Sequence, residues 1–236
     1  MEKNFKIAKV QDSVSNATFT LVNKGGQERI RKTFGTTKLQ SNGIDNMRMT
    51  RFNSPSDVKG TSTLIIEHAD QEDEIWVYLP ALKKVRRLVS SNKKESFMGT
   101  DFSYGDVIGY RVGDWSHKIL KEEEIDHQAC FLVESLPKND QVRSANGYSK
   151  RLSWIRKDNF VMIKGETWGL AGQPYKSFQF SEVELVDQAN GKWQTMKMEA
   201  FNLDSGHHSI IHLENFKSNQ AIKDEFFTIR YLEKED

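Results

Sequence analysis

Apolar and polar residues alternate with a period of two along most of the chain. Around residue 20, for example, Phe19 and Leu21 fall on one face of an extended segment and Thr18 and Thr20 on the other. Glycine- and proline-containing turns separate such segments. The pattern predicts strands at residues 17–24, 27–39, 46–53, 61–68, 74–79, 83–89, 116–125, 127–136, 148–156, 160–168, 176–186, 193–202 and 207–216.

Three short segments depart from this alternation. Residues 1–15 predict a lead-in or a short amphipathic helix. Residues 104–108 predict a helix whose N-cap is Asp101 or Ser103, because the oxygen of such a side chain can accept a hydrogen bond from a free backbone N–H. Residues 218–224 predict a helical turn, followed by a last apolar segment at 226–232.

Long strands joined by tight turns favour one strongly coiled antiparallel sheet of about eleven strands, with thirteen as the upper limit. Such a sheet must close into a barrel, stack into a sandwich or be covered on one face. No linker, change of composition or internal repeat divides the chain. We therefore expect a single domain over residues 1–236.

Composition narrows the classes of function. The 236 residues carry a net charge of +1, which argues against a general nucleic-acid binder, since that class needs a basic excess to neutralise phosphates. The only cysteine, Cys130, lies in an apolar alternating run, and we expect a buried thiol. The first residues lack the apolar core of a signal peptide. The sequence leaves open whether the protein is cytoplasmic or has lost a leader.

Catalytic motifs are not evident in the sequence. We find no nucleophile elbow, phosphate-binding loop or metal-binding His and Cys spacing, so we expect no enzyme, no metal and no cofactor. His208 and His212 would share one face of a strand but lie about 13 Å apart along it. Asp101 and Asp106 could form a carboxylate pair, although we prefer the helix-cap interpretation.

A dense basic set follows Pro80 and includes Arg86 and Arg87, which would point to opposite faces of a strand. One interpretation is a solvated strand protected by its charges against edge pairing. The other is a contact with a headgroup or partner, made by Arg86 or Arg87. The Met and aromatic residues also allow two interpretations: a packed core, or a deformable cavity for an apolar ligand.

Several segments resemble the outer membrane lipoprotein-sorting protein family of the LolA-like superfamily. The match is densest between residues 76 and 106. It is carried by Phe52-Asn53-Ser54-Pro55, Lys59-Gly60-Thr61, Trp76-Val77-Tyr78-Leu79-Pro80-Ala81-Leu82-Lys83-Lys84-Val85-Arg86-Arg87 and Ser96-Phe97-Met98-Gly99-Thr100-Asp101-Phe102-Ser103-Tyr104-Gly105-Asp106.

The resemblance implies an open, strongly curved antiparallel half-barrel with short helices over its concave face. It implies a periplasmic, non-catalytic carrier for the acyl chains of a lipoprotein, a lipid or a similar hydrophobic molecule. Cavity-lining positions would then be Met47, Met49, Leu64, Ile66, Trp76, Tyr78, Phe97, Met98, Phe102, Tyr104, Trp154, Met162, Trp168, Met196 and Met198.

Partners implied by the resemblance are an inner-membrane exporter, an outer-membrane acceptor and peripheral contact with a membrane. An alternative function is an adaptor that docks on an exporter of hydrophobic molecules without carrying cargo. That adaptor would use the basic strand and the loop from Phe97 to Phe102.

Overall fold

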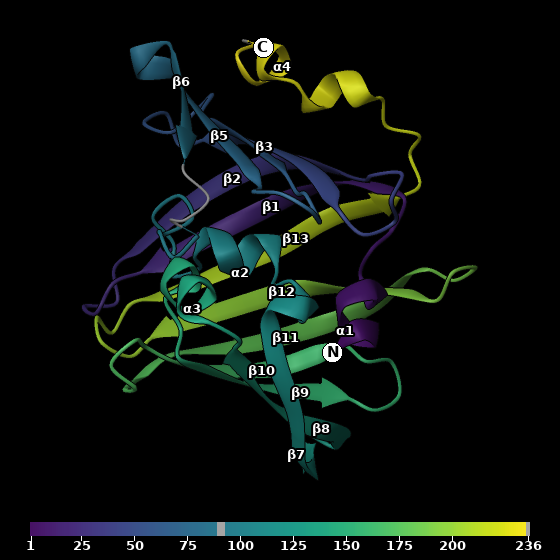
Figure 1. Ribbon diagram of the computed structural model, residues 1–236. Coiled ribbons are helices and arrows are strands. Elements are labelled where there is room, and N and C mark those ends of the chain that lie inside the picture. Colours follow the sequence, from purple (N-terminus) through teal and green to yellow (C-terminus); the bar gives the residue numbers. More distant parts are fainter. Residues whose placement is uncertain (89–92, 235–236) are drawn as a thin grey trace. The chain divides into compact units, whose positions relative to one another are not determined.

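The structure is a computed structural model that describes residues 1–88 and 93–234 (Figure 1). Its described strands form one sheet in the order β6-β5-β4-β3-β2-β1-β13-β12-β11-β10-β9-β8-β7. The strands are β1 (Asp12–Val22), β2 (Glu28–Leu39), β3 (Asn46–Ser54), β4 (Ser62–Ile66), β5 (Glu74–Leu79), β6 (Lys84–Leu88), β7 (Trp115–Ile125), β8 (Gln128–Pro137), β9 (Lys150–Arg156), β10 (Met162–Trp168), β11 (Pro174–Asp187), β12 (Lys192–Asn202) and β13 (His208–Ser218).

The helices are all short. They are α1 (Glu2–Ile7), α2 (Tyr104–Ile108), α3 (Asp140–Asn146), α4 (Ile229–Leu232) and the 3₁₀ helices η1 (Pro80–Leu82), η3 (Val112–Asp114) and η4 (Asp224–Phe227). Within residues 1–88 and 93–234, no helix has the length and apolar character needed to cross a membrane. The chain is therefore mainly antiparallel β, and the predicted fold class is confirmed with thirteen strands in place of about eleven.

Most predicted elements appear within a few residues of their predicted ends. The helix at 104–108 is confirmed, and Ser103 is its cap. The strand predicted from Lys83 runs over Lys84–Leu88, and Val89 lies outside the described residues. The first strand begins at Asp12, five residues before its predicted start.

The helical turn predicted at 218–224 is wrong. β13 continues to Ser218, and the helix η4 begins only at Asp224. Asn219 and Ala221 between them have φ angles of 57° and 55°. Because positive φ is incompatible with a right-handed helix, these two residues break the turn.

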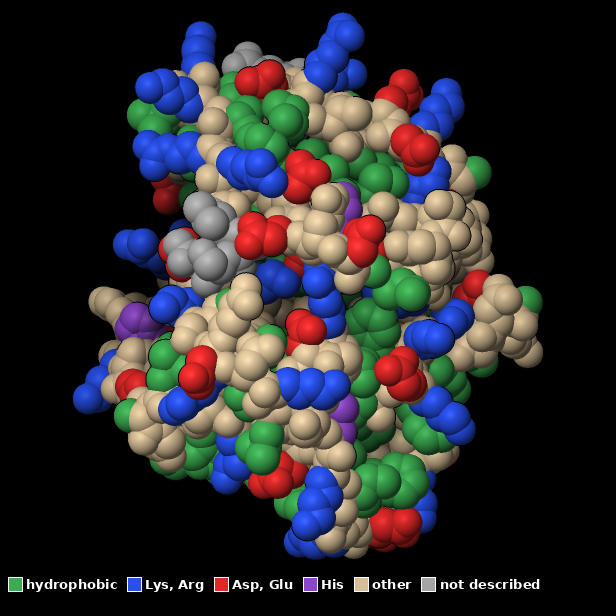
Figure 2. Space-filling view, viewed as in Figure 1, with side chains coloured by type: hydrophobic (Ala, Val, Ile, Leu, Met, Phe, Trp, Pro, Cys, Tyr) green, Lys and Arg blue, Asp and Glu red, His purple; other side chains and the backbone are tan. Residues whose placement is uncertain are grey.

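The chain divides into two compact units. Unit 1 comprises Met1–Ala8, Leu21–Glu28 and Ser91–Ile210, and unit 2 comprises Lys9–Thr20, Arg29–Ser90 and Ile211–Asp236. Each unit has its own apolar packing and its own short helices. On the face of the molecule shown in Figure 2, basic and acidic side chains are interspersed, as the net charge of +1 suggests.

In unit 2 the strands β2 to β6 pair in sequence order. Met49 is opposite Leu64, Leu64 is opposite Trp76, and Ser62 is opposite Tyr78. Paired residues share a face, so these side chains form one continuous surface. At one end of the unit the buried carboxylate of Glu67 accepts hydrogen bonds from the backbone N–H of Asn46 and from other donors, which satisfies its charge.

In unit 1 the strands β7 to β12 pair in sequence order, and two faces can be distinguished. Gly165 pairs with Phe178, and Phe178 pairs with Ala200, so these residues share one face. Trp154, which pairs with Leu132, lies on the other face. That second face holds the cluster around Cys130, whose thiol is fully buried as expected and has its pKa raised by burial.

Candidate functional site

Unit 2 contains a sheet face that is rich in sulfur and aromatic groups and closed by the end of the chain. We call residues 222–232 the C-terminal cover. Its apolar side chains pack on the sheet residues in one cluster, and Figure 1 shows α4 beside the strands β3 to β5. The cover contributes Ile222, Phe226, Phe227, Tyr231 and Leu232, and the sheet contributes Met47, Met49, Leu64, Ile66, Trp76, Tyr78 and Val85.

Polar contacts fasten the cover at both ends. Lys38 Nζ donates to the carbonyl oxygen of Ile222 at 2.8 Å and to Oδ1 of Asp224 at 2.6 Å. Arg51 Nη2 donates to the carbonyl oxygen of Tyr231 at 3.0 Å, and its guanidinium lies 5.6 Å from the centroid of the Tyr231 ring. Both cations come from the sheet, so the sheet determines where the cover begins and ends.

The cover is a short helical segment and not a strand. Thr228 caps α4 by accepting a hydrogen bond from the backbone N–H of Tyr231 at 3.2 Å. A segment of this kind adds no rung to the sheet's ladder of backbone hydrogen bonds. Its attachment therefore depends on apolar packing, on the contacts of Lys38 and Arg51, and on the buried Asp12 carboxylate, which accepts a hydrogen bond from the backbone N–H of Ile222 at 3.2 Å.

Unit 1 contains the second candidate, a buried polar cluster around Asp106. Its carboxylate accepts hydrogen bonds from the backbone N–H of Ser103 at 2.8 Å, from the hydroxyl of Tyr148 at 3.0 and 3.1 Å, and from the hydroxyl of Tyr110. Lys176 Nζ lies 3.6 Å from Oδ2. The Asp106 and Lys176 side chains are only 7% and 6% exposed, so a nearly dry carboxylate and ammonium face each other.

Local sequence explains how Asp106 reaches this position. It is the third residue of α2, and its carboxylate and the hydroxyl of Ser103 form a reciprocal capping box. Gly105 permits close approach to the end of α3, because a Cβ atom there would lie 3.3 Å from Oδ1 of Asn146. The helix cap and the buried ion pair thus use the same carboxylate.

The tyrosines of this cluster stay protonated at neutral pH. Burial raises the pKa of both Tyr110 and Tyr148 well above the usual range, and the nearby Asp106 carboxylate raises both further. Burial also raises the pKa of Tyr175, with Asp204 adding to the effect. Their hydroxyl groups therefore remain hydrogen-bond donors.

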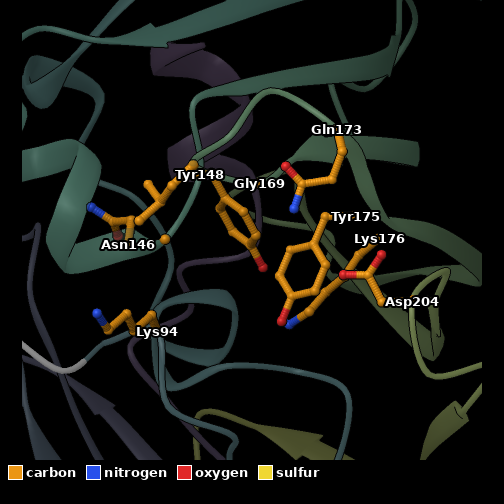
Figure 3. A pocket seen from close by; sticks show the side chains of 10 residues that line it. Lys94, Asn146, Tyr148, Gly169, Gln173, Tyr175, Lys176 and Asp204 are labelled. Atoms are coloured by element: carbon orange, nitrogen blue, oxygen red, sulfur yellow. The ribbon is translucent and has the colours of Figure 1, made fainter.

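A pocket of about 320 Å³ opens beside this cluster (Figure 3). We call it the Lys176 pocket. Its walls come from the segment before α2, the end of α3, the β10–β11 turn, the start of β11 and the β12–β13 turn. The lining residues are Lys94, Asn146, Gly147, Tyr148, Gly169, Leu170, Gln173, Tyr175, Lys176 and Asp204.

The comparisons with known proteins agree with one another. A family model with the description "Uncharacterized protein" matches residues 45–234. A domain from Vibrio parahaemolyticus named for outer membrane lipoprotein sorting is 25% identical, has a TM-score of 0.89 and covers 99% of this chain and 96% of its own. The chain belongs to the family that this model describes, and over nearly its whole length it is similar to the lipoprotein-sorting domain.

Two further solved structures extend the comparison. A DUF1329 family protein from Desulfovibrio piger is 27% identical, with a TM-score of 0.88 over 98% of this chain and 97% of its own. A LolA superfamily protein from Nitrosomonas europaea is 21% identical, with a TM-score of 0.72 over 98% of this chain and 96% of its own, which shows a shared fold. A search of curated proteins finds no match.

The structure distributes the predicted cavity residues of this protein among the covered face of unit 2, the loop before α2 and the two faces of the unit 1 sheet. Met47, Met49, Leu64, Ile66, Trp76 and Tyr78 lie together under the C-terminal cover. Phe97, Met98, Phe102 and Tyr104 lie in and around the loop before α2, where the Phe97 and Tyr104 ring centroids are 5.3 Å apart and Phe102 packs on Phe178.

The remaining predicted residues divide between the two faces of the unit 1 sheet. Met198 pairs with Phe180, so Met196 and Met198 lie on the face that carries Phe178. Met162 pairs with Ile155 and lies on the same face. Trp154 and Trp168 lie on the opposite face. There the ammonium groups of Lys164 and Lys150 lie 4.3 and 3.7 Å from the ring centroids of Trp154 and Trp168, respectively.

Arg86 and Arg87 do point to opposite faces. Arg87 pairs with Trp76 and stacks its guanidinium 5.3 Å from the Trp76 ring centroid, which places it beside the covered face of unit 2. Arg86 pairs with Val77 on the other face. Both side chains are exposed, and Figure 2 shows basic side chains gathered where Figure 1 draws β6.

The sequence interpretation missed the Lys176 pocket. One signal was available, because Lys176 has the same strand parity as Phe178 and Phe180 and so had to point toward the apolar face. The histidines gave no metal site: His208 bonds Glu199 at 3.0 Å, and within the described residues no group of three or more His, Cys, Asp and Glu could hold a metal ion.

Proposed function

We propose that this protein is a periplasmic, non-catalytic carrier that binds the acyl chains of a lipoprotein, a lipid or a similar hydrophobic molecule. The similarity to a domain named for outer membrane lipoprotein sorting supports this class of function. The observation that carries the proposal is the C-terminal cover, a short segment over a sheet face rich in Met and aromatic residues.

The free energy of binding an acyl chain favours a carrier whose cover can be exchanged for the chain. Burying one methylene group contributes about 0.8 kcal/mol, so a chain of about sixteen carbons needs on the order of 10 kcal/mol of apolar burial. A rigid cavity of that affinity would release its cargo slowly. If the chain replaces the cover's own apolar side chains on the sheet, most of that burial is exchanged, and binding and release stay nearly balanced.

The residues under the cover suit a flexible occupant. Met47 and Met49 have unbranched, polarisable side chains that adapt to different shapes. Trp76 and Tyr78 supply broad apolar surfaces at low cost in side-chain entropy. The same face could therefore pack either the cover or an acyl chain.

Loosening the cover tests the carrier function. Lys38→Ala removes both contacts to Ile222 and Asp224 and should let a fluorescent fatty acid bind severalfold faster than to the native chain. Lys32→Ala, an exposed position on the same strand, is the matched control and should bind the probe at the native rate. Native mass spectrometry of the purified protein should also detect bound lipid.

Two results would contradict this proposal, the first by removing the carrier function and the second by removing the cover as its site. One is the absence of any bound lipid in the purified protein together with no binding of the acyl probe. The other is probe binding that is equal in the native chain, Lys38→Ala and Lys32→Ala, which would place the site away from the cover.

A second candidate function is an adaptor that docks on an inner-membrane exporter. It is supported by β6, which ends the strand order and exposes Lys84, Arg86 and Arg87. The double variant Arg86→Glu with Arg87→Glu should lose recovery of the exporter in a pull-down from membranes, whereas Lys118→Glu on β7 should not. Equal recovery by both variants would remove this candidate.

A further inference from the structure

The Lys176 pocket has a charged donor at its base. Lys176 is 5% exposed, and its ammonium has one carboxylate neighbour, Asp106, at 3.6 Å. That separation is longer than a direct hydrogen bond. Asp106 already accepts hydrogen bonds from Ser103, Tyr110 and Tyr148. The Lys176 ammonium makes no hydrogen bond to an acceptor in the described part of the chain and so retains unused N–H groups.

A second donor converges on the same space. The Tyr175 hydroxyl has no hydrogen-bond partner among the described residues, and its raised pKa keeps it protonated. Lys176 Nζ lies 5.1 Å from the centroid of the Tyr175 ring. In Figure 3 the Tyr175 hydroxyl and the Lys176 amine point in the same direction, with the Tyr148 hydroxyl close by.

Because the Lys176 ammonium is buried, its unused N–H groups indicate the kind of ligand that the pocket would bind. A buried ammonium with unused N–H groups costs free energy unless an acceptor, preferably an anion, completes it. The volume of about 320 Å³ is at the lower end of the range for ligand sites and suits a compact group. The base of the pocket thus matches an oxyanion such as a phosphate or a carboxylate.

The rim has a different character. Leu170, which lines the pocket, is 40% exposed, and Leu203, next to the lining residue Asp204, is 55% exposed. The two turns that carry them meet at β11, where the backbone N–H of Leu203 donates to the carbonyl oxygen of Tyr175 at 2.9 Å. A polar base with one exposed leucine in the lining and a second in the adjoining turn matches a molecule that has a charged end and an apolar end.

Two structural details hold the walls in place. The backbone N–H of Lys94 donates to Ala145 at the end of α3, which fixes the segment that carries the exposed Lys94 side chain. Gly147 ends α3 with φ of 76°, and a Cβ atom there would lie only 3.0 Å from Cβ of Lys94. A side chain at residue 147 would therefore push Lys94 away from the pocket.

From these contacts we infer that the Lys176 pocket binds the anionic headgroup, a phosphate or a carboxylate, of an amphiphile. Lys176 and Tyr175 hold the anion, and Leu170 and Leu203 meet the first apolar atoms. This inference rests on the proposed carrier function, since it assigns the charged end of the cargo to a site of its own.

The test compares ligands that differ only in their headgroup. Dodecyl phosphate and dodecanoate should each bind the full chain at least about tenfold more tightly than dodecanol, measured by calorimetry. Lys176→Met should remove this preference and leave dodecanol binding unchanged. Tyr175→Phe, which deletes one hydroxyl, should reduce the preference about threefold to tenfold.

Matched controls separate the headgroup effect from general damage. Lys118→Gln removes an exposed lysine outside the pocket and should keep the native preference. Circular dichroism spectra should show that each variant is folded. If Lys176→Met does not fold, Tyr175→Phe, which deletes only a hydroxyl, still tests the site.

The outcomes distinguish the two proposals. Equal affinity for dodecyl phosphate and dodecanol overturns the headgroup site and leaves the carrier function standing. If neither amphiphile binds, the carrier function fails. A titration of inorganic phosphate into nitrogen-15-labelled protein then shows whether the pocket binds an anion. Amide shifts at Gly169 and Gly172 that disappear in Tyr175→Phe support an anion site, and their absence overturns it.

Discussion

The C-terminal cover and the Lys176 pocket bury side chains in opposite ways. Under the cover, a run of apolar side chains meets a sheet face of the same character, with polar contacts only at its two ends. Beside the pocket, Asp106, Lys176 and two tyrosines are buried as one connected polar group. The cover is held by the amount of apolar area that it buries, whereas the polar cluster is held by the direction of its hydrogen bonds.

This difference indicates which of the two regions can exchange its internal contacts for contacts with a ligand. Apolar burial is non-directional, so another apolar molecule can replace the cover at little net cost. A buried hydrogen-bond network needs each partner at a fixed distance and angle. We therefore expect the cover to yield to cargo and the pocket to keep its shape. The predictions below test that contrast from the largest effect to the smallest.

Asp106→Ala should cause the largest loss of stability. It removes the acceptor shared by Ser103, Tyr148 and Tyr110 and leaves the buried ammonium of Lys176 without a carboxylate. Breaking a buried pair in this way costs about 3–5 kcal/mol of unfolding free energy. Urea denaturation measures it, and Asp140→Ala, at an exposed position, serves as the control. A loss below about 1 kcal/mol for Asp106→Ala would contradict the network.

Leu64→Ala should come next, with a loss of about 3 kcal/mol. Leu64 is 1% exposed and lies in the cluster under the cover, so its truncation leaves a cavity. Ile229→Ala, in α4 but 41% exposed, should change the unfolding free energy far less. If added fatty acid restores the stability of Leu64→Ala, the cover is exchangeable as proposed. Equal losses in the two variants would show that the cluster is loosely packed.

Alkaline pH should weaken the pocket's unit. The folded-state pKa values of Tyr110 and Tyr148 are raised above the unfolded value of about 10. The contribution of these two tyrosines to the free energy of unfolding is complete below about pH 10. It is lost as pH rises further, because the unfolded chain releases protons that the folded chain keeps. Each tyrosine adds a slope of at most about 1.4 kcal/mol per pH unit. Tyr148→Phe should flatten this decline in urea titrations between pH 10 and 11, and an unchanged slope contradicts the assignment.

The helix caps should give the smallest effects. Ser103→Ala breaks the capping box of α2, and Thr228→Ala removes the cap of α4 in the cover. Each cap contributes about 1 kcal/mol. Hydrogen exchange should show Thr228→Ala opening only the cover, whereas Ser103→Ala should lower global stability through Asp106. Global unfolding free energies that fall equally in both variants would remove the contrast between the two regions.

Local patterns predicted the elements well because their causes are local. The alternation around Phe19 and the turn Asn190-Gly191 each place a strand or a hairpin without reference to distant residues. Ser103 was identified as a cap because capping needs only three neighbouring residues. The turn at 218–224 was mispredicted because nothing in its composition signals positive φ at Asn219 and Ala221.

The role of each predicted site residue depended on contacts across the chain. Met49 and Leu64 were recognised as apolar, but only the structure shows that Phe227 and Leu232 cover them. Trp154 is a large aromatic residue of the kind expected in a cavity wall. Its strand pairs in a register that places Trp154 opposite Leu132, on the face of the sheet that does not carry Phe178. A shift of one residue in register reverses the face, and the sequence does not specify register that finely.

By itself, then, the sequence determined an antiparallel sheet, its turns, the capped helix at Tyr104–Ile108 and the family resemblance, all of which follow from local pattern. Tertiary structure alone decided that the chain's last residues cover a Met-rich face. It also brought Lys176 and Tyr148, which lies 42 positions from Asp106 in the sequence, to the Asp106 carboxylate. Buried charges are tolerated only where partners converge, and convergence is a property of the folded chain.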